Sequence, residues 1–123
     1  MFKRLCSLFF LMMIVGSEAL AKAPAFIDGL EDIPLMKGLI QKTDETVSFG
    51  NEESRFVEVS LSSSKVGFKA VEKFYKESLP QLGWTYQGSA DNTVIFYRDS
   101  ESLNIHKEDS KPLKIRIIVK NRI

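Results

Sequence analysis

Apolar and polar residues alternate most regularly near the carboxyl end of the chain. Residues 113–120 read LKIRIIVK, with an apolar side chain at every odd position. Because successive side chains of a strand point to opposite faces, this period of two predicts a β-strand with one buried face. Three shorter segments before it have the same strand character and are separated by polar turns: residues 84–88, 93–100 and 102–108.

Two more alternating segments occupy residues 43–49 and 55–62. The residues between them read GNEES, and their Gly and Asn suit the tight turn of a hairpin. We expect the apolar positions of both segments to face the core together: Val47, Phe49, Val57, Val59 and Leu61.

A helical period separates these two groups of strands. With residues spaced about 100° apart around an axis, the apolar side chains share one arc and the lysines lie opposite. The arc holds Phe68, Val71, Phe74, Tyr75, Leu79 and Leu82. Hydroxyl groups at residues 62–64 offer N-caps, and Gly83 suits the left-handed residue that often ends a helix. We interpret Pro80 as a bend on the solvent side that brings Leu82 and Trp84 onto the sheet.

The fold class follows from the order of these elements. Residues 22–42 contain prolines and glycines at short intervals, which excludes a long helix or strand, yet they are too apolar for a free tail. We therefore expect an ordered arm followed by elements in the order β-β-α-β-β-β, with room for one more short strand. This order predicts a single α+β domain over residues 22–123, with one antiparallel sheet and one amphipathic helix packed across one face.

The first residues of the chain predict a secretory signal peptide at residues 1–21. Two basic residues precede an apolar run at residues 5–16, which is shorter than the roughly 20 residues that span a bilayer. An Ala-x-Ala site ends at Ala21, so we expect cleavage between Ala21 and Lys22 and no stable membrane span afterwards. An uncleaved anchor is the alternative. A lipid anchor is disfavoured because Cys6 lies inside the apolar run.

Two short stretches of the sequence resemble a known group of proteins. Residues 33–39 read IPLMKGL, and residues 69–86 read KAVEKFYKESLPQLGWTY. They resemble small exported proteins of Gram-negative bacteria, particularly alphaproteobacteria, that pair a PLxxGL stretch with an FYxxxLPxLGW helix. The likeness covers residues 33–98. It implies a periplasmic or secreted setting and carries no catalytic residues over to this chain.

Charge and cysteine content narrow the classes of partner and chemistry. Residues 22–123 contain 15 basic and 15 acidic residues, so their formal charge is zero. Such a balance provides no long-range field to gather nucleic acid or an anionic membrane, and we expect neither as a partner. The same residues contain no cysteine, which excludes disulfides, thiolate metal sites and cysteine nucleophiles.

The strongest candidate for catalysis is His106, the only histidine of the chain. Strand alternation turns its ring toward solvent, where a surface histidine without a chemical role is the commoner case. The acidic residues near it lack the spacing of a calcium-binding loop, and neither a G-x-S-x-G motif nor a phosphate-binding glycine loop occurs. The sequence therefore predicts no catalytic residue, cofactor or metal.

The sheet face away from the helix is the feature most suggestive of function. Apolar residues at Phe56 and Ile118 would lie there among basic ones such as Arg116, and an apolar cluster rimmed by charge can mark a partner site. The alternative is that the arm covers this face as a third layer. We therefore expect a non-catalytic exported module that binds a protein, a peptide or a cell-wall component of the envelope. The alternative function is a small hydrolase-like enzyme that uses His106 and loop carboxylates.

Overall fold

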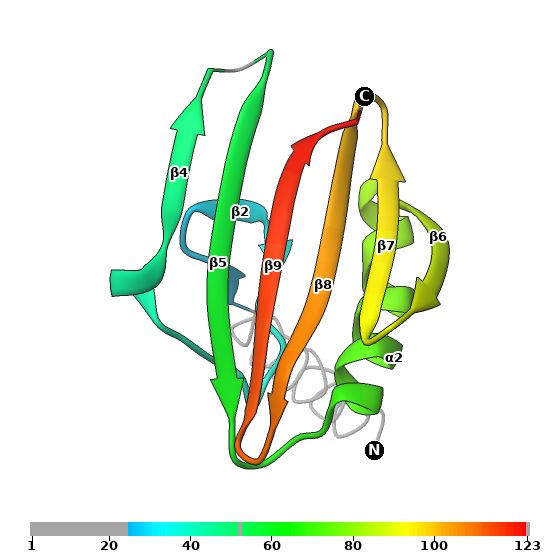
Figure 1. The fold of residues 1–123 in the computed structure, drawn as a ribbon. Coiled ribbons are helices and arrows are strands. Elements are labelled where there is room, and N and C mark those ends of the chain that lie inside the picture. Colours follow the sequence, from blue (N-terminus) through cyan, green and yellow to red (C-terminus); the bar gives the residue numbers. More distant parts are fainter. Residues whose placement is uncertain (1–24, 52, 123) are drawn as a thin grey trace, which may run out of the picture.

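One antiparallel sheet forms most of the domain (Figure 1). The computed structural model describes residues 25–51 and 53–122, so the predicted signal peptide lies outside the described residues. The sheet has seven strands in the order β3-β5-β9-β8-β7-β6, with β4 paired to β5 on the same side as β3. A helix packs against one face of this sheet, which confirms the predicted α+β class.

Six of the seven strands of the sheet overlap the alternating segments, whereas β3 lies in the arm and residues 43–45 of one predicted segment form no strand. The strands are β3 (Ile40–Gln41), β4 (Val47–Gly50), β5 (Arg55–Ser63), β6 (Thr85–Ala90), β7 (Thr93–Arg98), β8 (Glu101–Ser110) and β9 (Leu113–Asn121). A 3-10 turn, η1 (Thr43–Glu45), separates β3 from β4. β4 and β5 form the predicted hairpin, β6 to β9 form a meander, and β9 lies alongside β5 at the centre of the sheet.

The register of the central strands produces one apolar face, which we call the inner face. Val59 lies opposite Ile117, and Ile117 lies opposite Ile105, so the alternating positions form continuous rows across three strands. The inner-face residues buried in the core are Val57, Val59, Leu61, Val94, Phe96, Leu103, Ile105, Leu113, Ile115, Ile117 and Val119. Burial of these rows is the main source of stability that the strands offer.

The helix is shorter than the sequence predicts. It comprises α2 (Phe68–Ser78), followed by a 3-10 turn, η2 (Leu79–Leu82). Pro80 is exposed as expected, but it lies in η2, because a prolyl ring inside an α-helix clashes with the carbonyl one turn earlier. Gly83 then has a φ of 94°, the left-handed conformation predicted for the end of this segment.

Two details predicted for this segment are wrong. Leu82 is 39% exposed, whereas Trp84 is buried, so the turn delivers only the tryptophan to the core. The helix is capped at Gly67 rather than by a hydroxyl group of residues 62–64. The Ser63 hydroxyl instead accepts two backbone N–H groups in the turn that precedes the helix.

The amino-terminal arm packs on the inner face, beside the helix. Its strands β1 (Phe26–Ile27) and β2 (Leu30–Pro34) pair with each other and form a small separate sheet behind β5 and β9 in Figure 1. Four arm residues join the same buried cluster as the sheet and the helix: Ile27, Leu30, Ile33 and Leu39. The interpretation that the arm covers the opposite face is therefore wrong, because the arm shares the inner face with α2.

Tyr75 links the helix to the arm. Its side chain is fully buried, whereas its neighbour Phe74 is only partly buried. The Tyr75 hydroxyl donates a 2.8 Å hydrogen bond to the carbonyl of Pro34 at the end of β2. Burial raises the pKa of the Tyr75 phenol, so the group stays protonated and able to donate.

The orientation of β4 also differs from the prediction. Phe49 pairs with Phe56 and Val47 pairs with Glu58, so the side chains of β4 that were expected inside face away from the helix. Val47 is 44% exposed and Phe49 is 64% exposed. In this register the odd-numbered residues of β4 lie opposite the even-numbered residues of β5. Val47 and Phe49 therefore lie on the face of the sheet opposite to that of Val57.

Replacement of Tyr75 by phenylalanine tests the link between helix and arm. We expect Tyr75→Phe to lower the free energy of unfolding by about 1–2 kcal/mol, because the buried Pro34 carbonyl loses its donor. Chemical denaturation measures the change. The control is Tyr86→Phe, whose hydroxyl bonds to Ser89 at the surface and whose loss should cost less than about 0.5 kcal/mol. Equal costs for the two variants would show that the buried bond does not hold the arm.

Candidate partner-binding surface

The sheet face opposite the helix, which we call the outer face, is uncovered in Figure 1 among the described elements. It is less apolar than the inner face and mixes isoleucines, serines and charged residues. In its central row, Glu58, Ile118, Asn104 and Ile95 lie opposite one another on four successive strands. A sheet that is apolar on one face and mixed on the other is typical of antiparallel sheets with one solvated side.

The largest exposed apolar group on the outer face lies at the edge of the sheet. Phe49 of β4 and Phe56 of β5 stack with their ring centroids 5.0 Å apart and an interplanar angle of 14°. Val47 lies two residues from Phe49 on the same face of the same strand. We call Val47, Phe49 and Phe56 the edge patch. Phe49 is exposed and Phe56 is half-buried, and aromatic rings at a surface contribute contact area at low entropic cost when they bind a partner.

β4 itself is an edge strand. Within the described residues it pairs with β5 alone, so one side of its backbone faces away from the sheet. Proteins usually protect such an edge with a charged residue or a proline within the strand. The four residues of β4, VSFG, contain neither.

A short polar turn fixes the shape of this hairpin. The Asn51 carboxamide oxygen accepts the backbone N–H groups of Glu53 and Ser54 at 2.9 and 3.0 Å. Gly50 has a φ of 107°, and a Cβ atom there would lie 2.2 Å from the carbonyl oxygen of Ser54. Only glycine fits at this position, so β4 is held against β5 in the register that exposes Phe49.

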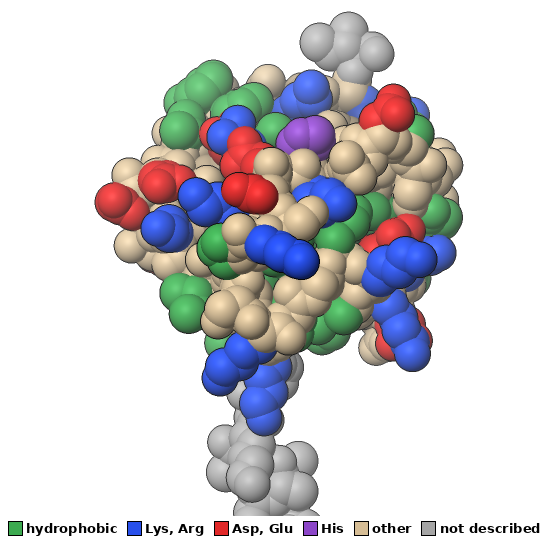
Figure 2. Space-filling view, turned by 60° about the horizontal axis from the view of Figure 1, so that its bottom comes forward, with side chains coloured by type: hydrophobic (Ala, Val, Ile, Leu, Met, Phe, Trp, Pro, Cys, Tyr) green, Lys and Arg blue, Asp and Glu red, His purple; other side chains and the backbone are tan. Residues whose placement is uncertain are grey.

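The structure places the three predicted partner-binding residues on the outer face. Phe56 belongs to the edge patch, and Ile118 is half-buried in the row that contains Glu58. Arg116 is not free to meet a partner, because its guanidinium contacts the Glu108 carboxylate at 2.6 Å and that of Glu58 at 3.5 Å. Figure 2 shows basic and acidic side chains interleaved in this way around exposed apolar ones.

His106 is exposed on the same face, as predicted. Its Nδ1 atom lies 2.8 Å from the Thr93 hydroxyl oxygen on the neighbouring strand. On the other neighbouring strand, β9, the residue opposite His106 is Arg116, whose charged guanidinium cannot serve as a general base. Over residues 25–51 and 53–122, no group of three or more histidine and acidic side chains is placed to hold a metal ion.

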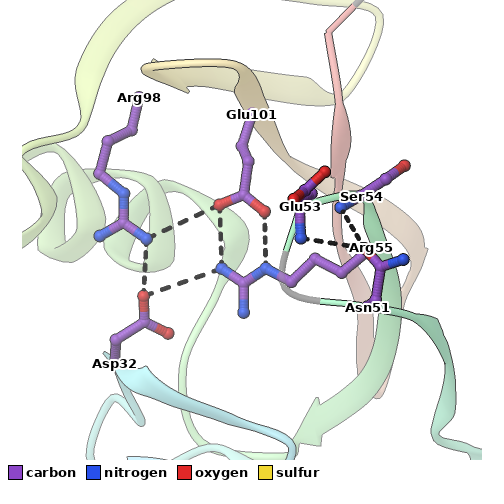
Figure 3. A network of polar contacts seen from close by, with 7 residues as sticks. All are labelled: Asp32, Asn51, Glu53, Ser54, Arg55, Arg98 and Glu101. Atoms are coloured by element: carbon purple, nitrogen blue, oxygen red, sulfur yellow. Dashed lines mark hydrogen bonds and ion pairs between the residues drawn. The ribbon is translucent and has the colours of Figure 1, made fainter.

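Four charged residues form a network on the inner face, at the end of the sheet nearest the β4–β5 turn (Figure 3). Arg55 donates from Nε and Nη2 to the two carboxylate oxygens of Glu101, at 2.6 and 3.0 Å. Arg98 donates to Asp32 of β2 at 2.7 Å. We call Asp32, Arg55, Arg98 and Glu101 the ion network. The hydrogen bond with Glu101, opposed by burial, raises the pKa of Arg55, so its guanidinium group stays charged.

The sequence offered no local signal for this network, because Asp32 and Arg98 are 66 residues apart. Its contacts hold separate parts of the fold together. Arg98 also donates to the Leu82 carbonyl and lies over the Trp84 ring at 4.2 Å, so the network joins the arm, the end of the helical segment and the sheet. Two cations and two carboxylates leave the group neutral, which suits a stabilising cluster better than a site that captures a charged ligand.

An open depression of about 970 Å³ lies beside this network. The inner side of the β4–β5 hairpin forms one wall, with Ser48 and Gly50, and the β7–β8 turn forms another, with Asp99. Gly29 of the arm also lines it. The depression lies directly behind the edge patch, so both sides of β4 are accessible.

Comparisons of the chain with protein-family models, with curated proteins and with solved structures find no match. The resemblance to small exported proteins therefore stays a prediction from two short runs of sequence. Among the helices that the structure describes, none has the length and apolar content needed to cross a membrane.

Replacement of Glu101 by glutamine tests whether the ion network is structural. We expect Glu101→Gln to lower the free energy of unfolding by about 1–3 kcal/mol, because Arg55 loses a charged bidentate partner in a partly buried setting. Thermal and chemical unfolding measure this change. The exposed Asp44→Asn in η1 removes a carboxylate outside the network and should change stability by less than about 0.5 kcal/mol. A Glu101→Gln variant as stable as the unmodified protein would contradict the structural role.

Proposed function

We propose that the protein is a non-catalytic binding module of the bacterial envelope. A signal peptide at residues 1–21 exports it, and the edge patch then holds a protein or peptide partner. The observation that carries this proposal is the exposed ring of Phe49, stacked on the half-buried ring of Phe56, in a strand with an unpaired edge among the described residues. Exposed aromatic side chains beside open backbone donors and acceptors suit recognition by strand addition.

The position of the first strand is compatible with export. β1 begins at Phe26, after the proposed cleavage point between Ala21 and Lys22. Removal of residues 1–21 would leave every described strand and helix in the mature chain.

Binding is favoured over the enzyme alternative by the surroundings of His106. General acid–base catalysis needs a base held by a second group and a site that excludes water. His106 is exposed and contacts a threonine hydroxyl, while its ladder neighbour Arg116 is committed to two carboxylates. Glu108, the acidic residue two positions along β8 from His106, is already paired with Arg116.

Site-specific photocrosslinking in living cells tests this function. A benzoylphenylalanine placed at position 49 should crosslink to one recurring partner, identified by mass spectrometry of the joined peptides. The same group at Lys73, which is exposed on α2, should not capture that partner. We expect Phe56→Ser to reduce the adduct at position 49, because the second ring of the stack is lost.

His106→Gln serves as the matched control for the enzyme alternative. It changes an exposed residue on the same face and should leave the adduct at position 49 unchanged. Crosslinking of equal yield and identity at positions 49 and 73 would overturn the edge patch as the binding surface. Immunoblotting of each variant in the envelope fraction ensures that differences in yield do not reflect protein level.

A further inference from the structure

The charges around β4 identify the chemistry of its partner. We propose that β4 takes up an extended segment of another protein that has apolar side chains in its middle and basic residues at its ends. This inference rests on the proposed binding function and adds the class of segment that is bound.

The strand is flanked by acidic residues on both sides. Residues 43–54 contain four acidic residues and no basic one: Asp44, Glu45, Glu52 and Glu53. The apolar core of the segment, VSF, lies between these two acidic pairs. We call Asp44, Glu45 and Glu53, which the structure describes, the acidic flanks. A strand laid along β4 would pass its ends near these negative charges, so basic ends would be attracted and acidic ends repelled.

The depression behind β4 has the same preference. Three of its charged residues, Arg55, Arg98 and Glu101, already bind one another within the ion network. The other charged residues that line it are Glu53 and Asp99, which are exposed and acidic. A basic side chain that enters the depression would therefore meet negative charge, in the space of about 970 Å³ that lies there.

The two faces of β4 set the pattern of side chains in the partner. On the outer face Val47 and Phe49 are exposed, so a paired strand would place apolar residues beside them. On the inner face Ser48 and Gly50 line the depression and are small, so alternate side chains of the partner have room there. Alternation of apolar and polar residues in an extended segment satisfies both faces.

A second copy of this chain is a poorer occupant. Pairing of β4 with β4 of another copy would bring two sets of acidic flanks together, with six carboxylates and no basic residue within residues 43–54 of either chain. Like charges placed across an interface oppose association. Self-association is therefore an outcome that the experiment has to detect rather than the one that we expect.

Synthetic peptides of matched pattern test the inference on the protein purified from the cells that produce it. The peptide acetyl-KKVTVTVKK-amide supplies an alternating apolar segment with basic ends, and acetyl-EEVTVTVEE-amide supplies the same segment with acidic ends. Binding is measured by fluorescence anisotropy of labelled peptides at two salt concentrations. We expect the basic peptide to bind at least about tenfold more tightly and to weaken as salt is raised.

Variants of the protein assign the binding to β4. Glu53→Lys should weaken the basic peptide several-fold, and Phe49→Ser should weaken both peptides. Glu77→Lys makes the same change of charge at an exposed site on α2 and should have no effect.

Two further basic peptides, with backbone amides N-methylated either on the valines or on the threonines, distinguish strand addition from other kinds of contact. One of these two methylated peptides should bind and the other should not, because only alternate amides of an added strand donate hydrogen bonds to β4.

The outcomes separate this inference from the function on which it rests. If both peptides bind equally and Phe49→Ser weakens them, the edge patch binds partners but the charge rule is wrong. If neither peptide binds, or if both methylation patterns bind, addition of such a segment to β4 is overturned, while crosslinking at position 49 still reports on the edge patch. A dimer in sedimentation that Phe49→Ser dissociates would assign β4 to a second copy and also overturn the inference.

Discussion

The fold depends on covering one wide apolar sheet face with a short helix. α2 has 11 residues and is therefore about 16 Å long, whereas six strands side by side span roughly 24 Å. The helix covers only part of the inner face, and the arm supplies the remaining cover. The hydrogen bond from Tyr75 to the Pro34 carbonyl joins the two covering elements inside the core, where a lost partner would be costly.

The place where this cover ends determines the surface that is left for binding. Asp32 in β2 of the arm meets Arg98 and Arg55, and beyond this ion network the β4–β5 hairpin extends past the arm and the helix (Figure 1). β4 is therefore accessible from the outer face, from the depression and along its unpaired backbone. The acidic flanks lie at both ends of this strand, so the same hairpin combines an apolar centre with negative ends.

Much of this architecture is predictable from periodicity, and the exceptions have physical causes. Alternation located the strands, and the helical arc located α2, because both patterns are local. The inward orientation predicted for Val47 and Phe49 was wrong because alternation groups the side chains of one face without saying which face is buried. That choice depends on the register of the hairpin, which Gly50 and the Asn51 turn determine.

The position of the arm and the pairing of Asp32 with Arg98 are not predictable from local patterns, because both depend on contacts between residues far apart in the sequence. Phe56 and Ile118 were correctly placed on the outer face, whereas the commitment of Arg116 to two carboxylates was not foreseen.

β4 has an open edge among the described residues, and amide hydrogen exchange resolved by residue measures whether that edge is open in the free protein. We expect the slowest exchange in β8 and β9, which are paired on both sides. In β4 we expect an alternation, with the amides bonded to β5 protected and those that face away from it exchanging as fast as amides in exposed loops. Protection of every amide in β4, in a monomeric sample without a partner, would show that this edge is already covered and unable to take up a partner strand.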